Sequence, residues 1–443
     1  MPTFNEVLAI NDANLSNPDF RSSTGVAKAI YDDGAKGFTD GLHLEPYEGS
    51  SYDLPMELEE ASGSGVVAVN SANIVRSNGQ DTRVQVKERV FHRDVVSSIK
   101  SEKFNSKEIK QRHRNIERNA KATGKEFVSL GLLGTGYGKR HSGAAFWTTA
   151  FAGHVRPSGT RTRPHDSGDF KYPVRTEQKL FWTENDLPGG TAKAFDTDAL
   201  NAFHTLCGDT PFSKVLVTKD VWLALEDIVD AAPGNMAQYF RNQGQNYEML
   251  RFKGVDYYRL EALSRPLTSS YVATSADGLT VTFDDDAEAA AAASGTFETF
   301  PGFSDAMVGA SITVTDGSNT ATRTIEDVVD WQTVIVDTAL PAGLQSETAA
   351  SISVKQSSRI IGLTYDGDEG FHFAFGGGDA TAEDGSVDLA YDDTYTQIAG
   401  VRHTDVGRLQ TGMRAYMDHI DLWGNFACGS ASAVAEMSGF SIA

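Results

Sequence analysis

The sequence predicts an α+β fold of more than one module, into which a small all-β domain is inserted. The chain has 443 residues, more than one hydrophobic core usually organises, so two or three modules are expected. Helical and strand patterns alternate along most of the chain, whereas residues 268–355 are rich in Ala, Thr, Asp and Ser and carry β patterning. Hydrophobic residues make up 40% of the chain, which is enough for a sizeable core and excludes disordered and collagen-like proteins.

The sequence predicts neither a membrane span nor a secretory signal. No stretch approaches 18 consecutive apolar residues, and the start, MPTFNEVLAI, lacks a basic region followed by an apolar one. The two cysteines, Cys207 and Cys428, lie far apart and predict no disulfide framework and no zinc knuckle. We therefore expect the protein to be located in a reducing cytoplasm, or in a particle that is assembled in one.

Charge is distributed along the chain in blocks. Residues 83–125 carry 13 bases and 5 acids, a net charge of +8, within a chain whose net charge is −21. Residues 1–60, 268–355 and 356–443 are acidic, with net charges of −9, −11 and −9. The basic segment predicts either a surface that faces nucleic acid or an element that docks on the acidic surface of another copy. The overall excess of acids favours self-association.

Residues 1–60 are expected to form an N-terminal arm. They are rich in Asn, Asp, Ser and Gly and contain only short apolar clusters such as Val26–Ile30. Such a segment cannot form a core of its own and would be ordered by lying on other surfaces. Pro46 and Pro55 favour an extended backbone.

Residues 61–100 are expected to form an extended β-hairpin loop. One strand would run over 66–75 and the other over RVQVKERVF (83–91), with Asn78-Gly79 in the turn, where both residues tolerate positive φ. Two interpretations stay open, because a hairpin this polar is marginal on its own. It is the edge of a larger sheet, or a projecting loop that a neighbouring subunit completes.

Residues 101–135 contain the clearest helix pattern, over about 105–131, with Asn105 or Ser106 as the cap. Lys and Arg occupy much of its surface, so the helix is expected to lie half-exposed across a sheet. Its apolar residues form a narrow stripe at Ile109, Ile116, Ala120, Phe127 and Leu130. The glycine-rich stretch GLLGTGYGKRHS (131–142) would end it.

Residues 136–267 and 356–443 are expected to form a mixed α/β core. The predicted elements are a helix at 195–207 capped by Asp196 or Thr197, a buried strand at 214–218 leading into the helix KDVWLALEDIV, and a strand at 252–260.

Residues 268–355 predict a separate β module, because they have strand patterns, turn residues and only two bases. Mixed patterning resumes after this segment, so the module is expected to be an insertion in its host domain. The predicted strands are 279–283, 311–315, 333–337 and 351–355, with an alanine-rich piece at Ala287–Ala293 and a turn at Asp316-Gly317.

We predict no catalytic residue, no cofactor site and no metal site. The glycine-rich stretch fails the phosphate-loop pattern, because Gly138-Lys139 is followed by Arg140. The ten histidines are scattered and none forms a zinc motif. Asp284-Asp285-Asp286 lacks the glycine and distal glutamate of a calcium loop, so a solvated acidic turn is favoured. Cys207 lies on an apolar helical face and is expected to be buried.

The order of these elements resembles that of the major capsid proteins of tailed bacteriophages, the Hong Kong 97 fold. The resemblance covers nearly the whole chain outside 268–355. Local stretches are similar too: the helix leading into GLLGTGYG, the unit KVLVTKDVWLALEDIV, the strand FKGVDYYRLE, and the end IAGVRHTDVGRLQTGMRAYMDHIDLWGNFACGSASAVAEMSGF. The resemblance implies that 61–100 is the extended loop, 101–135 holds the spine helix, and the rest forms the peripheral and axial domains.

The resemblance implies a structural, non-enzymatic protein that self-assembles into hexamers and pentamers of an icosahedral head around double-stranded phage DNA. Its partners would be other copies of itself, a portal and a decoration protein, with DNA contacted non-specifically on the inner face and no membrane. No long charged coiled-coil prefix precedes the arm, so scaffolding is expected to be a separate protein, or a leader has been lost. The expected location is the virion, after assembly in the host cytoplasm.

Four bases are predicted to contact acidic surface on neighbouring copies: Arg83, Lys87, Arg89 and Arg93. Reversal of Lys87 and Arg89 to Glu is expected to block particle assembly without unfolding the subunit. Part of the basic helix could instead face packaged DNA. The acidic insertion is expected on the capsid exterior, and deletion of 268–355 is expected to leave shells able to form.

Two alternatives remain from the sequence alone. An encapsulin, which encloses an enzyme instead of DNA, would use the same kind of fold. A β-rich carbohydrate-binding protein or hydrolase is the alternative of a different class, prompted by the Asp/Gly/Thr-rich C-terminal half; the missing signal peptide argues against it. A sugar-binding role for the insertion alone also stays open.

Overall fold

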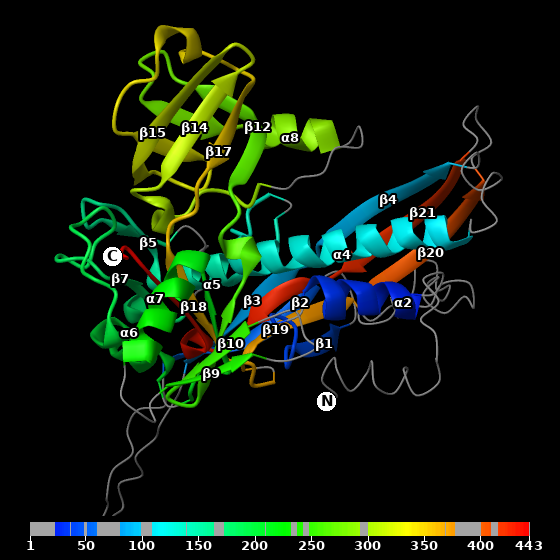
Figure 1. Ribbon diagram of the computed structural model, residues 1–443, viewed down its shortest axis with the longest axis horizontal. Coiled ribbons are helices and arrows are strands. Elements are labelled where there is room, and N and C mark those ends of the chain that lie inside the picture. The colour runs from blue at the N-terminus through cyan, green and yellow to red at the C-terminus, as the bar shows by residue number, and fades with distance from the viewer. Residues whose placement is uncertain are drawn as a thin grey trace, which may run out of the picture.

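The computed structural model describes residues 23–35, 37–47, 51–59, 80–98, 109–138, 140–163, 172–208, 210–231, 237–241, 248–292, 300–367, 369–376, 400–408 and 415–442. Over these residues the protein is α+β, as predicted. Figure 1 shows three parts: a core of helices and sheets, a β-barrel on one side of it, and a long helix-and-sheet layer that projects from it. Among the described helices, none combines the length and the apolarity that crossing a bilayer would require.

The core is built on a seven-stranded sheet of order β7-β23-β18-β8-β11-β10-β9. Strands β8 and β18 are buried on both faces, which explains why residues 215–217 and 360–363 carry no polar side chain, although each strand begins with a buried base, Lys214 or Arg359. On one face Val215 and Ile360 pack with the helices α6 and α7, and on the other Leu216 and Ile361 join the main core. The bounds are β7 (Lys179–Phe181), β8 (Lys214–Val217), β9 (Ala237–Arg241), β10 (Glu248–Phe252), β11 (Val255–Arg259), β18 (Arg359–Leu363), β23 (Val434–Ser438), α5 (Ala144–Ala152), α6 (Thr197–His204) and α7 (Lys219–Ala231).

Two core predictions can be compared directly with the structure. Asp196 caps α6 as expected, since its side chain accepts hydrogen bonds from the amides of Asp198 and Ala199 at 3.0 and 2.9 Å. The strand expected at 252–260 is instead the end of β10, a two-residue turn and β11. Lys253 and Gly254 both have positive φ, which closes a tight hairpin between the two strands.

The segment after β11 forms a closed six-stranded barrel of order β12-β13-β16-β15-β14-β17. It coincides with the residues for which composition predicted a separate β module. The strands on either side of it in the chain, β11 and β18, both border β8, so the barrel is an insertion within one sheet. Its elements are β12 (Leu267–Thr274), β13 (Thr280–Phe283), α8 (Asp285–Ala292), β14 (Ser311–Asp316), β15 (Asn319–Val328), β16 (Thr333–Val336) and β17 (Ala350–Val354).

The projecting part consists of the 25-residue helix α4 (Ile109–Leu133) on a three-stranded sheet, and we call the two together the spine layer. Such a helix is about 37 Å long. In the sheet, of order β20-β21-β4, strand β21 (Ala415–Trp423) pairs with β4 (Val90–Ser98) over their whole lengths, and β20 (Val401–Arg408) lies on its other side. Helix α4 packs on one face of this sheet, as its narrow apolar stripe predicts; Asn105 and Ser106 lie outside the described residues.

The predicted arm and hairpin need correction. Strand β2 (Ser51–Glu59), expected in the arm, pairs with β3 (Gln80–Lys87) because Leu54 and Met56 share a buried face with Val84 and Val86. The expected single strand 83–91 is divided between β3 and β4, which pair with different partners. The other expected strand, 66–75, and the Asn78-Gly79 turn lie outside the described residues.

Much of the described arm is built into the core instead of lying on its surface. Helix α2 (Ser23–Lys28) and the following π-helical turn (Ala29–Gly34) bury Val26 and Ile30 against the main core beside α4. Strand β1 (His43–Tyr47) pairs with β19 (Phe371–Gly376), which pairs in turn with β22 (Asn425–Cys428). A small ribbon of β5 (His154–Val155) and β6 (Arg161–Thr162) follows α5. Along the described residues the order of the parts is therefore hairpin strands, long helix, α/β core and inserted barrel.

Candidate functional site

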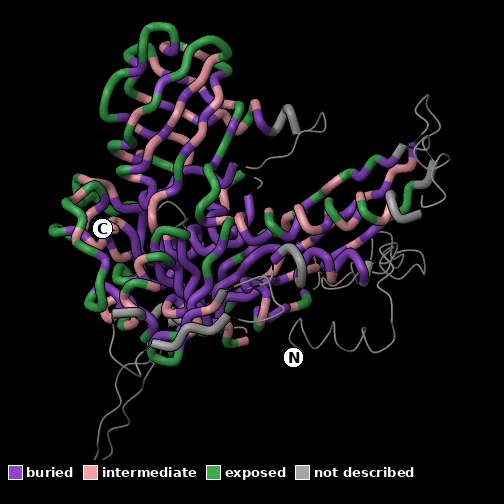
Figure 2. The backbone as a smooth tube through the Cα atoms, in the orientation of Figure 1, coloured by how far each residue is buried: buried purple, intermediate pink, exposed green. Residues whose placement is uncertain are grey.

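The sheet of the spine layer has one face against α4 and one that points away from it. On β4, Phe91 and Val95 are buried on the helix side, whereas Val90 and Val96 on the other side are 41% and 54% exposed. Figure 2 shows this alternation along the projecting layer. Of the six exposed large hydrophobic residues among those described, three lie on this sheet: Val90, Val96 and Val406.

At the far end of the spine layer the apolar residues form a row across the three strands. Val96 is directly opposite Met417, and Val406 lies in the bulge of β20 beside the same residue. Val406 is 47% exposed and Met417 half-buried. Isolated exposed apolar residues are ordinary, but a row across neighbouring strands is typical of a surface that another protein covers.

The four predicted contact residues do not form one patch. Arg83 and Lys87 are exposed on the outer face of β3, where they alternate with buried Val84 and Val86. Arg89, between β3 and β4, is used within the chain: its guanidinium donates to the carbonyls of Gly138 and Arg140 at 2.7 and 3.2 Å.

Arg93 is also used within the chain. It lies on the helix side of β4 and forms a 2.5 Å ion pair with Glu126 of α4, which ties the helix to the sheet. Among the described residues, the side chains of Arg83 and Lys87 make no hydrogen bond or ion pair, although the carbonyl of Lys87 accepts from Asn425 at 2.8 Å.

The outward side of α4 adds a second basic feature. Arg114, Arg118 and Lys125 are exposed and recur at spacings of four and seven residues, which places them on one side of the helix. Arg112 faces the sheet instead, where it pairs with buried Asp418 at 2.7 Å and with Asp405 at 2.6 Å. Some basic residues of the helix therefore bind it to the sheet, and others form an exposed basic side.

The glycine-rich stretch after α4, expected to be only an exit from the helix, holds the barrel in place. The Arg140 guanidinium, buried on all sides, pairs with Asp285 at 2.6 Å and Glu288 at 2.8 Å of α8 and donates to the carbonyl of Phe300 at 2.6 Å. It also lies over the rings of Phe283 and Trp331, 4.7 and 4.9 Å from their centroids. Asp285 is thus part of an ion pair and not of a solvated turn.

A second buried ion pair joins the barrel to the core. Lys179 of β7 lies 2.9 Å from a carboxylate oxygen of Asp305, and both side chains are at most 2% exposed. Asp305 also accepts from the amide of Val155 at 3.0 Å. Burial alone would raise the pKa of Asp305, but the charges of Lys179 and His154 and its hydrogen bonds outweigh burial and lower this pKa.

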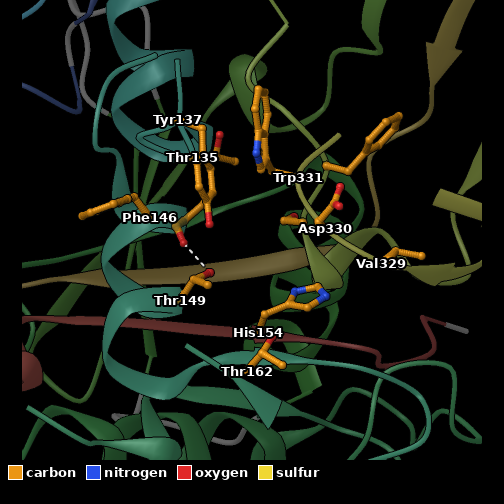
Figure 3. Close-up of a pocket in the computed structure, with 12 residues that line it drawn as sticks. Thr135, Tyr137, Phe146, Thr149, His154, Thr162, Val329, Asp330 and Trp331 are labelled. Atoms are coloured by element: carbon orange, nitrogen blue, oxygen red, sulfur yellow. Dashed lines mark hydrogen bonds between the residues drawn. The ribbon is translucent and has the colours of Figure 1, made fainter. Parts of the chain in front are cut away.

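A cleft of about 470 Å³, partly open to solvent, lies at the same junction (Figure 3). Core residues such as Tyr137 and Thr149 line one side, and barrel residues such as Asp330 and Trp331 line the other. Tyr137 stacks on Trp331 with centroids 5.0 Å apart, and His154 is 2.7 Å from the carbonyl of Val328. These polar groups serve the packing of the barrel on the core.

Sequence reasoning missed this junction because its residues, which range from Tyr137 to Trp331, lie far apart in the chain. The one available signal was the pairing of an acidic insertion with bases in a nearly neutral core. Arg140, Arg156 and Lys179 each pair with an acid of the insertion.

Comparisons with known proteins give structural matches and no sequence matches. No family model and no curated protein matches the sequence. The structure is similar to the encapsulin in the holo-SrpI complex of Synechococcus elongatus PCC 7942, with 10% identity and a TM-score of 0.45 over 90% of this chain and 86% of that one. It is also similar to a chain of the cyanophage A-1(L) capsid, with 7% identity and a TM-score of 0.45 over 90% of both chains.

A third match is the capsid of a native GTA particle, with 10% identity and a TM-score of 0.41 over 94% of this chain and 91% of that one. At TM-scores below 0.5 the similarity assigns no function and no residue role.

Proposed function

We propose that this chain is the structural subunit of a closed protein shell: a major capsid protein that assembles into hexamers and pentamers around double-stranded phage DNA. The observation that carries the proposal is the spine layer. A single chain has no evident use for a long helix and sheet that project from the core with apolar residues on the uncovered face, whereas neighbouring subunits in a shell would cover that face.

The distribution of charge supports contact between copies. Arg83 and Lys87 present positive charge on β3, and the barrel and its helix α8 present exposed acids. These acids are Asp277, Asp286, Glu326, Asp330 and Asp337. Opposite charges on different parts of one chain are complementary when copies meet, and like parts repel, which favours one mode of association over others.

The test is assembly of a charge-reversed variant. Because Arg89 supports the loop that holds the barrel, the informative pair is Arg83→Glu with Lys87→Glu, in place of the pair that the sequence suggested. We expect this variant to stay folded, with an unchanged melting temperature, but to elute as free subunits or capsomers in size-exclusion light scattering and to show no shells in electron microscopy.

The matched control reverses two exposed bases on other elements, Lys219→Glu with Lys355→Glu, and is expected to assemble as the unmodified protein does. Normal shells from the Arg83/Lys87 variant would contradict the proposed contact. A chain that stays monomeric at high concentration and with its partners present would contradict the shell itself.

An encapsulin is the second candidate, since it would need the same uncovered spine layer. The contents of native particles separate the two: packaged nucleic acid supports a capsid, and an enclosed enzyme supports an encapsulin. A separate scaffolding protein, a portal and a decoration protein belong to the capsid proposal, as do a location in the virion and assembly in the host cytoplasm. Co-purification of particles from infected cells would test these partners.

A further inference from the structure

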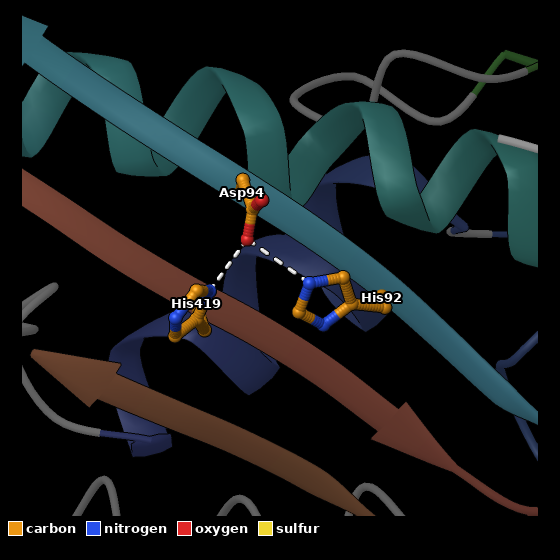
Figure 4. Close-up of side chains that lie close together, drawn as sticks. All are labelled: His92, Asp94 and His419. Carbon is orange, nitrogen blue, oxygen red and sulfur yellow. Dashed lines mark hydrogen bonds and ion pairs between the residues drawn. The ribbon is translucent and has the colours of Figure 1, made fainter. Parts of the chain in front are cut away.

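Two histidines and two aspartates lie together on the face of the spine layer that points away from α4. Figure 4 shows three of them, His92, Asp94 and His419. On β4, His92 and Asp94 point to the same side because strand residues two apart share a face. On β21, His419 and Asp421 do the same. In the antiparallel register His92 is directly opposite Asp421, and Asp94 is directly opposite His419. Two His-x-Asp pairs therefore face each other in opposite directions.

The side chains converge on Asp94. One carboxylate oxygen of Asp94 is 2.5 Å from Nδ1 of His419 and 3.0 Å from Nε2 of His92. One ligand atom from each of the three residues lies within 4.8 Å of the other two. In a tetrahedral site with bonds of 2.0–2.1 Å, neighbouring ligand atoms are about 3.3 Å apart. A small outward movement of the three side chains would give that spacing.

The fourth residue orients the first. Nδ1 of His92 is 2.5 Å from a carboxylate oxygen of Asp421, so His92 donates its Nδ1 proton there and directs Nε2 toward Asp94. A carboxylate behind the non-coordinating nitrogen of a histidine is the usual support of a metal-binding imidazole. Asp421 is only 16% exposed, whereas His92 is 46% exposed, so the support is fixed and the ligand side is open to solvent.

The charges around the cluster suit a cation. On the neighbouring strand β20, Arg402 is paired in register with Asp421, and Thr404 with His419. Helix α4 packs on the opposite face of the sheet. With neutral imidazoles, the two carboxylates and Arg402 sum to one negative charge. A bound divalent cation would change this net charge from −1 to +1, so its magnitude would stay the same.

We propose that His92, Asp94 and His419 bind one Zn²⁺ ion, with Asp421 holding His92 in position and the fourth coordination position open to water. Two imidazoles and one carboxylate form a ligand set that suits Zn²⁺ and not Ca²⁺ or Mg²⁺, which prefer oxygen ligands throughout. This site goes beyond the proposed shell function and does not depend on it.

Protons compete with the metal for the same nitrogens. A metal-binding imidazole must be deprotonated, so Zn²⁺ affinity is expected to be lower in acid.

The experiment is a titration of the full-length chain, freed of metal by a chelator and dialysed, first with Co²⁺ as a spectroscopic probe and then with Zn²⁺ in a calorimeter. We expect one ion per chain, visible absorption bands of tetrahedral Co²⁺, and loss of these bands when Zn²⁺ is added. His92→Ala and His419→Ala should each abolish the one-to-one binding, and Asp421→Asn should weaken it by about 10- to 100-fold.

His113→Gln is the matched control, because His113 lies on α4, away from the outer face of the sheet. This variant should bind as the unmodified chain does. Two outcomes would overturn the site: no uptake of either metal at 1 mM by the unmodified chain, or an unchanged isotherm in the variant that carries both His92→Ala and His419→Ala.

Discussion

His141 shows how a single residue links the glycine-rich stretch to acid sensitivity. Its ring stacks on Phe91 with centroids 3.9 Å apart, and among the described residues neither ring nitrogen has a hydrogen-bond partner. Burial, and then the nearby charge of Arg89, lower the pKa of His141 to about 3. Burial, with Lys253 nearby, also lowers the pKa of His204, to about 4.

These two pKa values predict a loss of stability in acid. In the unfolded chain both histidines titrate near 6.5, so their contribution to stability is complete above that pH and is lost as the pH falls toward the folded-state values. Fully buried His141 is expected to remove about 1.4 kcal/mol of unfolding free energy per pH unit below about 6, and half-exposed His204 less, because solvent screens its charge. Urea unfolding followed by fluorescence at several values between pH 7 and 5 measures the slope.

His141→Gln isolates one of the two contributions, because glutamine is polar and does not titrate. We expect this variant to have a lower stability at pH 7 and a shallower pH slope than the unmodified chain, with the slope of His204 remaining. Equal slopes in the two proteins would show that His141 is not the group responsible.

The role of a residue was predicted correctly where it depends on residues nearby in the sequence. It was not predicted where it depends on contacts with residues far away in the sequence. Asp196 was found as a cap because capping depends on the next three residues. Arg83 and Arg89 are indistinguishable in sequence, yet one is exposed and the other donates to carbonyls about 50 positions away. No local pattern contains that difference.

At the scale of elements, the barrel and the core depend on two buried ion pairs. Removing one member of such a pair leaves the other charged and buried, which costs more than removing both. Asp305→Asn is therefore expected to lower the unfolding free energy by about 3–5 kcal/mol. The double variant Lys179→Met with Asp305→Leu should lose less than the sum of its two single variants.

The measurement is a double-mutant cycle from chemical unfolding curves of the four proteins. The pair Arg251–Asp256 on the hairpin of β10 and β11 is a suitable control, because Arg251 and Asp256 bond at a more exposed position. Replacement of either member there should lower the unfolding free energy far less than Asp305→Asn does, because the pair is exposed to solvent. Additive losses at Lys179 and Asp305 would show that the two residues are not coupled.

The elements also show why some boundaries could not be predicted. Strands β13, β14, β16 and β17 of the barrel were located from their alternating patterns, and α4 from its narrow stripe, whereas β12 was not predicted. The division of 83–91 between two strands follows from their partners, residues 51–59 and 415–423, which lie far away in the sequence. Helix α5, almost wholly buried, has no polar side and gives no periodic signal.

For the whole molecule, the ion pairs between the barrel and the core change the expected result of deleting the barrel. The sequence alone suggested that removal of 268–355 would leave shells able to form. In the structure, the side chains of Arg140 and Lys179 are each 2% exposed and pair with acids of the insertion, so this deletion would leave two buried bases without their acidic partners. We expect the simple deletion to be poorly soluble and the same deletion with Arg140→Leu and Lys179→Met to recover soluble subunits.

Thermal melting, light scattering and electron microscopy of the two deletion proteins check this expectation. Shells from the deletion with both replacements would show that the barrel is not needed for assembly. A simple deletion as soluble and as heat-resistant as the full chain would contradict the role given to the two ion pairs.

The barrel begins at Leu267 and ends at Val354, and these two residues are directly paired on neighbouring strands. Because the two ends are adjacent, the insertion spans only a short distance in the host sheet, whatever the length of the inserted chain. A foreign domain with adjacent ends, given suitable partners for Arg140 and Lys179, could be exchanged for the barrel at this point. In a closed particle every copy would carry one, so the junction defines a place for ordered, high-density display of cargo on the particle.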